Sequence, residues 1–128
     1  MESIIIELNY DKETKNKLRW KKVFSKGSSE IHILKWRVPE SIPKIIKVEI
    51  KDGQLKEIKR YTEVECKIHK ESKYDPIYEN IRFKEEFGNT YSYVPIASSK
   101  ERHFDFFHIP KELLKVRYEL LNIRVDWN

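Results

Sequence analysis

Basic residues flank aromatic residues at several points in this 128-residue sequence, as in Arg19-Trp20-Lys21, Lys35-Trp36-Arg37 and Arg60-Tyr61. This combination binds single-stranded nucleic acid, because cations contact phosphates and exposed aromatic faces stack on bases. In a strand, however, Trp36 would lie on the face opposite Lys35 and Arg37. We therefore expect Trp36 in the core, and the pattern predicts phosphate contacts first and base stacking second.

The charge distribution also favours a polyanionic partner. The net charge is +5, but residues 12–60 contain 15 Lys/Arg against 6 Asp/Glu, whereas residues 61–128 contain 11 against 12. A one-sided basic surface attracts DNA or RNA. The competing interpretation is a solvating lysine-rich surface, since enrichment in Lys and Glu is typical of hyperthermophile proteins. The residues expected to contact nucleic acid are Lys17, Arg19, Lys21, Lys22, Lys35, Arg37, Lys59 and Arg60.

Asp52, Glu65 and Lys67 suggest an alternative, enzymatic chemistry. Asp52 precedes the Glu-x-Lys tripeptide by thirteen residues, and Glu65 and Lys67 share one face of a predicted strand. Magnesium-dependent nucleases of the PD-(D/E)xK type use such a set, in which two carboxylates hold the cation and the lysine positions or activates water. The same tripeptide occurs at residues 49–51, and a turn already explains Asp52. A metal-dependent nuclease is therefore the alternative hypothesis, and Mg²⁺ is expected only with it.

A third hypothesis is a protein-interaction module whose basic face meets an acidic partner. It predicts a contiguous apolar patch beside the cations.

Other site chemistries lack the required residue spacing. The four histidines, at positions 32, 69, 103 and 108, do not match a metal-ligand pattern, so ordinary hydrogen bonds are expected for them. Cys66 is the only cysteine and lies on the apolar face of a predicted strand, which indicates an unreactive thiol. The three glycines fall at predicted turns or caps rather than in a phosphate-binding loop. We therefore expect no cofactor for the binding function.

Period-two alternation predicts β-strands through most of the chain. The basic stretch from Lys17 to Gly27 is interpreted as a strand with Trp20 and Phe24 facing the core. Asp52-Gly53 between two alternating runs predicts a two-residue hairpin, and the prolines at 39 and 43 predict a surface loop. The other predicted strands are residues 3–10, 30–38, 61–69, 90–96 and 102–109, with a last edge strand at 123–128.

Two helices are expected to complete the fold. The first, about residues 75–87, has Asp75 as N-cap, Pro76 at its first position and Gly88 as its stop. The second, about residues 110–121, begins at Pro110 and has five apolar residues on its inner face. The expected fold class is therefore α+β, with a mostly antiparallel sheet in meander order.

Residues 1–128 are expected to form a single domain with a basic, β-rich N-terminal half at 12–60. The first residues lack the basic region and long apolar run of a signal peptide, and we expect no membrane span. With one cysteine and no possible internal disulfide, the sequence favours the cytoplasm.

Overall fold

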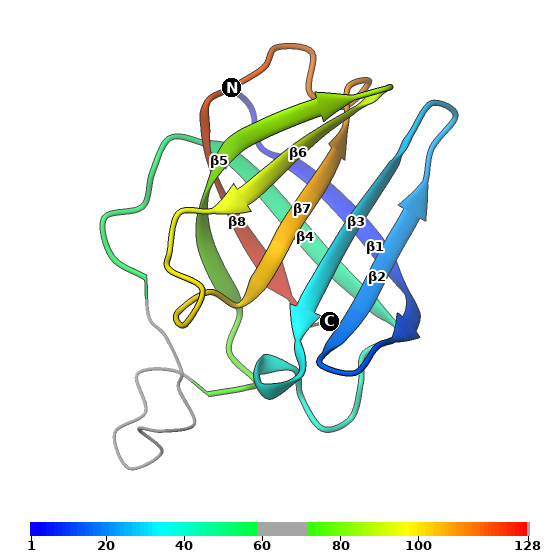
Figure 1. Ribbon diagram of the computed structural model, residues 1–128, viewed down its shortest axis with the longest axis vertical. Coiled ribbons are helices and arrows are strands. Elements are labelled where there is room, and N and C mark those ends of the chain that lie inside the picture. Colours follow the sequence, from blue (N-terminus) through cyan, green and yellow to red (C-terminus); the bar gives the residue numbers. More distant parts are fainter. Residues whose placement is uncertain (59–71, 128) are drawn as a thin grey trace.

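The computed structural model describes residues 1–58 and 72–127, and its strands follow the alternation of apolar and polar residues. In these residues, eight antiparallel strands close into a barrel (Figure 1). One short 3-10 helix, Lys35–Arg37, follows the third strand. The strands are β1 (Ile4–Glu13), β2 (Lys17–Val23), β3 (Ser28–Leu34), β4 (Ile45–Asp52), β5 (Ile77–Phe87), β6 (Thr90–Pro95), β7 (Phe104–Pro110) and β8 (Leu120–Asp126).

The strands follow the order β1-β2-β3-β7-β6-β5-β8-β4 around the barrel. β1 to β3 form one antiparallel meander and β5 to β7 form another, and the two meet between β3 and β7. β4 and β8 pair with each other and close the ring against β1 and β5. Every strand described here therefore has a partner on both edges.

The interior of the barrel is filled by side chains from alternate strand positions. Fully buried examples are Leu8, Ile31, Ile46, Val48, Ile50, Phe107, Leu121 and Ile123. Trp20 is fully buried, as the sequence predicts, and its indole Nε1 donates a hydrogen bond to the carbonyl oxygen of Pro43 at 3.0 Å. Burying one large apolar side chain contributes about 1.5 to 3 kcal/mol. This core therefore provides the main stabilisation of the barrel.

The predicted helix at residues 75–87 is wrong, because Ile77–Phe87 forms strand β5. Ile77 and Ile81 are both buried, and their spacing of four residues fits one face of a helix as well as one face of a strand. Glu79 between them also points inward and is fully buried, which completes the alternation of a strand.

The predicted helix at residues 110–121 is also wrong. Residues 111–119 form a non-helical connection, and the chain then enters β8. Leu114 is buried although Val116 remains exposed, so the apolar residues of this segment do not share one buried helical face. From Leu121 on, every second residue is buried, as expected for a strand. The fold is thus an all-β barrel and not the expected α+β domain.

The predicted hairpin at Asp52-Gly53 is wrong as well. Gly53 has a φ of 88°, as a tight turn requires, but residues 54–58 do not form a strand. β4 already pairs with β1 and β8, so neither edge of β4 is open to the residues that follow it. The meander order predicted for the whole sheet is also wrong, because β4 pairs with β1 and β8 and not with its neighbours in the sequence. The strand predicted at 61–69 lies outside the described residues.

The other strand predictions agree with the barrel, with three changes. The strand predicted from Lys17 to Gly27 ends at Val23, so Phe24 lies just after β2. β3 ends at Leu34 instead of Val38, because the 3-10 helix turns the chain there. The C-terminal strand is not an edge strand, since β8 pairs with both β4 and β5. Among the described residues, no helix is long and apolar enough to cross a membrane.

Candidate functional site

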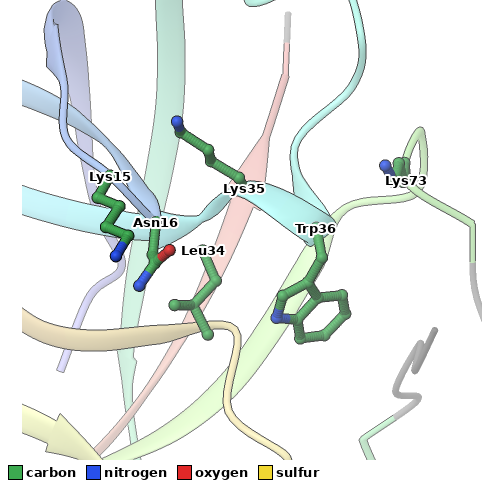
Figure 2. Close-up of a pocket in the computed structure, with 6 residues that line it drawn as sticks. All are labelled: Lys15, Asn16, Leu34, Lys35, Trp36 and Lys73. Carbon is green, nitrogen blue, oxygen red and sulfur yellow. The ribbon is translucent and has the colours of Figure 1, made fainter. Parts of the chain in front are cut away.

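A basic pocket of about 520 Å³ lies at the end of the barrel where the β1–β2 turn meets the end of β3. Its lining residues are Lys15, Asn16, Leu34, Lys35, Trp36 and Lys73. In Figure 2 Leu34 and Asn16 lie between the indole of Trp36 and Lys15, Lys73 lies on the other side of the indole, and the ammonium group of Lys35 points away from it. We call this site the Trp36 pocket.

The 3-10 helix explains why Trp36 lines a pocket instead of the core. The backbone N–H of Val38 donates to the carbonyl oxygen of Lys35 at 3.2 Å, which closes the turn. The backbone N–H of Lys35 in turn donates to the carbonyl oxygen of Asn16 at 2.9 Å and fastens the turn to the β1–β2 connection. Lys35 and Trp36 therefore line the same pocket, contrary to the strand alternation expected from the sequence. Trp36 is half-buried.

Arg37 has a structural position, although the sequence predicts a phosphate contact. Its side chain is fully buried. Its guanidinium donates hydrogen bonds to the carbonyl oxygens of Lys73 at 3.0 Å, Asp75 at 2.8 Å and Pro76 at 3.2 Å. A charged donor in such a site orders the backbone that it contacts. Arg37 thus fixes the segment that carries Lys73 into the pocket.

A tight turn at residues 72–75 orders the same segment from the solvent side. The Asp75 carboxylate accepts from the backbone N–H of Ser72 at 3.0 Å, and the N–H of Asp75 donates to the carbonyl oxygen of Ser72 at 3.1 Å. The hydroxyl oxygen of Ser72 accepts from the N–H of Tyr74 at 3.1 Å. Side chains of Asp and Ser commonly stabilise turns in this way. The backbone beside the pocket is therefore preorganised.

A buried polar pair lies next to Trp36. His103 and Glu79 are both fully buried, and His103 Nδ1 lies 2.7 Å from Glu79 Oε2. The same carboxylate oxygen accepts from the backbone N–H of His103 at 2.9 Å. The rings of His103 and Trp36 are 6.0 Å apart between centroids. The hydrogen bonds between Glu79 and His103 connect β5 to the start of β7, on the interior side of Trp36.

The described part of the pocket lining is electropositive, because it contains lysines and no carboxylate. The ammonium group of Lys35 is neutralised by Glu13, at 2.7 Å. Within the described ranges 1–58 and 72–127, Lys15 and Lys73 have no acidic partner within 4.0 Å. Two cations that lack an acidic partner among the described residues, in one pocket with an indole, can bind an anionic ligand that has a flat aromatic part.

The predicted basic surface of β2 is partly neutralised by acids from neighbouring strands. Lys17 forms an ion pair with Asp105, and Arg19 with Asp11. Glu30 also lies 3.7 Å from Arg19. These cations have less charge available for phosphate than the sequence indicates.

Lys21 and Lys22 remain the available cations of β2. Neither has an acidic partner among the residues that the structure describes, and the Lys22 ammonium lies 5.4 Å from the ring centroid of Phe24. The other two predicted contacts, Lys59 and Arg60, lie outside the described residues. Of the six predicted contacts that the structure describes, Lys35 lines the Trp36 pocket and Arg37 is buried.

The residues of the nuclease hypothesis are described only in part. Asp52 ends β4, and its Oδ1 lies 3.3 Å from the N-terminal ammonium group. Glu65 and Lys67 lie outside the described residues, as do Cys66 and His69. Within residues 1–58 and 72–127, no group of three or more His, Cys, Asp or Glu side chains is placed to hold a metal ion.

Lys15, Asn16 and Lys73 were not predicted as site residues from the sequence. Lys73 precedes Tyr74, so this dipeptide has the same basic-aromatic pattern as the pairs singled out above, but it falls just before the wrongly predicted helix. Lys15 and Asn16 lie between two strands, a position where the chain must turn. Comparisons with protein-family models, with curated proteins and with solved structures found no match.

Proposed function

We propose that this protein binds nucleic acid at the Trp36 pocket, mainly through phosphate contacts. The observation that carries the proposal is that Lys15 and Lys73 share one pocket with the half-buried indole of Trp36. Among the described residues, neither lysine has an acidic partner and no carboxylate lines the pocket. Cations that contact phosphates beside an aromatic face that stacks on a base are the usual parts of such sites. The sheet-surface cations Lys21 and Lys22 add further phosphate contacts.

The dimensions of the pocket support a bound nucleotide unit. Its volume of about 520 Å³ falls within the range of about 300 to 1,000 Å³ that is usual for small-ligand sites. Among the described residues, the 3-10 helix is the only helical segment, so the chain offers no recognition helix for the major groove. Binding should consequently depend little on base sequence, because phosphate contacts carry no sequence information.

The proposal is tested by binding of a fluorescein-labelled oligonucleotide, followed by anisotropy, in competition with polyglutamate. Wild-type protein should bind the oligonucleotide, and affinity should fall steeply as salt rises from about 50 to 200 mM. Polyglutamate should compete weakly, because it presents negative charge without bases. Trp36→Ala should weaken oligonucleotide binding and leave polyglutamate binding unchanged.

The opposite pattern would favour the acidic protein partner over nucleic acid. In that case polyglutamate displaces the oligonucleotide efficiently, and Trp36→Ala affects both ligands equally. The absence of oligonucleotide binding at about 50 mM salt refutes the proposal.

A further inference from the structure

A second groove lies on the other side of the turn that carries Lys73. Its volume is about 610 Å³, and its lining includes Pro39, Ile42, Pro43, Ile45, Tyr74 and Trp127. Tyr74 is 70% exposed although it is one of the largest side chains in this region. An exposed aromatic ring on an ordered backbone is available for a ligand at a low entropic cost. We call this site the Tyr74 groove.

The Tyr74 groove and the Trp36 pocket are lined by two residues that are adjacent in the sequence. Lys73 lines the pocket and Tyr74 lines the groove. Arg37 holds the carbonyl oxygens of Lys73 and Asp75 from inside the barrel, and the indole N–H of Trp127 donates to the Asp75 carbonyl oxygen at 3.0 Å. The relative positions of the two sites are therefore fixed by buried hydrogen bonds.

The charge around the groove is also positive. Lys44 lines the groove, and Lys47 lines a smaller hollow of about 170 Å³ that shares Tyr74 with it. Asp126 borders the hollow, but its carboxylate is held by Arg124, whose Nε lies 3.0 Å from Oδ2. The lysines of this region therefore keep their charge for a ligand, as Lys73 does.

We propose that the Tyr74 groove is a second base-binding subsite, so that one single strand of nucleic acid occupies the pocket and the groove together. This inference rests on the proposed function. One base stacks on Trp36, a second stacks on Tyr74, and Lys73 contacts the phosphate backbone between them. Both rings require a base that is not stacked in a duplex, so the ligand is single-stranded DNA or RNA.

An apolar peptide is the other occupant that such a groove could accept. The positive charge around the groove and its place on the same turn as Lys73 of the Trp36 pocket favour nucleic acid, because an apolar peptide gains nothing from flanking lysines. The two occupants also differ in what they require of Tyr74, since base stacking needs the aromatic ring.

The test compares binding of thymidine 5′-monophosphate and of oligothymidylates of up to about 12 nucleotides by wild-type, Tyr74→Ala and Tyr74→Phe proteins. The mononucleotide has one base and fills the Trp36 pocket alone, so all three proteins should bind it equally. Longer oligomers should bind wild-type and Tyr74→Phe alike, but Tyr74→Ala about 5-fold to 150-fold more weakly, the loss of one stacked base. Thermal unfolding should show that Tyr74→Ala folds normally, because the side chain is exposed.

The controls separate this inference from the function on which it rests. If Tyr74→Ala binds every oligomer as wild-type does while Trp36→Ala binds weakly, the second subsite is refuted and the proposed function stands. The groove is then available to an apolar peptide. If wild-type protein binds none of the oligomers, both proposals are wrong. A duplex bound more tightly than a single strand of equal length also refutes the second subsite.

Discussion

Replacing Lys15 and Lys73 together by alanine should weaken nucleic-acid binding and reduce its dependence on salt. Lys15 is exposed and Lys73 is partly exposed, and neither forms an ion pair within the described residues. Substitutions of this kind usually change stability by no more than about 0.5 kcal/mol each. The double variant should therefore keep the fold and lose only the two cations beside Trp36.

The size of the effect follows from the release of counterions. On single-stranded nucleic acid, each neutralised phosphate contributes about −0.7 to the slope of log K against log salt, so two lost contacts should make the slope shallower by about 1.4. If the ionic contribution vanishes near 1 M salt, the affinity should drop about 60-fold at 50 mM salt and about tenfold at 200 mM. The loss should be similar for all base sequences.

Anisotropy titrations at several salt concentrations measure both quantities. The matched control is Lys84→Ala with Lys115→Ala, which removes two exposed cations toward the opposite end of the barrel and gives the same net charge. This control should change the affinity by less than about threefold, because long-range interactions are screened within about 10 Å at 0.1 M salt. Equal losses in both double variants would refute the reasoning, since they would show a general effect of net charge instead of a local site.

Three further predictions concern the groups that support the pocket and the barrel. Arg37→Lys should lower the free energy of unfolding in urea by about 2 kcal/mol or more and weaken oligonucleotide binding. If the free energy of unfolding and the affinity both stay at wild-type values, Arg37 does not position the turn at residues 72–75. Glu79→Ala should destabilise the barrel by about 3 to 5 kcal/mol, because His103 loses its buried partner, and a change below about 1 kcal/mol would contradict this role. Burial lowers the pKa of His108 below its ordinary value of 6.5, although nearby Glu30 partly opposes this shift. The unfolded chain therefore binds a proton at His108 more readily than the folded protein does. The stability of the folded protein should consequently fall as the pH decreases below 6.5. His108→Gln should flatten this part of the pH profile, and an unchanged profile would assign the dependence to other groups.

The strands were largely predictable from the sequence because alternation is a local property. The helix predictions failed where local patterns were ambiguous, as at Ile77 and Ile81, whose spacing fits both a helix and a strand. The hairpin at Gly53 failed for a different reason. Its turn residue is in the expected conformation, but the partners of β4 come from the two ends of the chain, and no local signal specifies such pairing.

The candidate site was less predictable because it depends on contacts between distant segments. Lys15, Lys35 and Lys73 come from three connections of the barrel, and only closure of the sheet brings them to one end. The orientation of Trp36 depends on the 3-10 turn at Lys35–Arg37. This turn was not predicted, because the alternation of apolar residues continues through Val38 and indicates a strand. The neutralisation of Arg19 by Asp11 depends on the β1–β2 register, which the sequence does not specify.

Quenching of Trp36 fluorescence by an oligothymidylate tests the central claim most directly. Trp20 is 0% exposed, and Trp127 lines the Tyr74 groove but is only 7% exposed, whereas Trp36 is half-buried at the edge of the pocket. A base stacked on Trp36 should therefore quench Trp36 most strongly. We predict saturable quenching of the wild-type protein at the concentrations that produce the anisotropy change, and little quenching of Trp36→Phe. Binding without quenching, or equal quenching in Trp36→Phe, would contradict a base-binding site at Trp36.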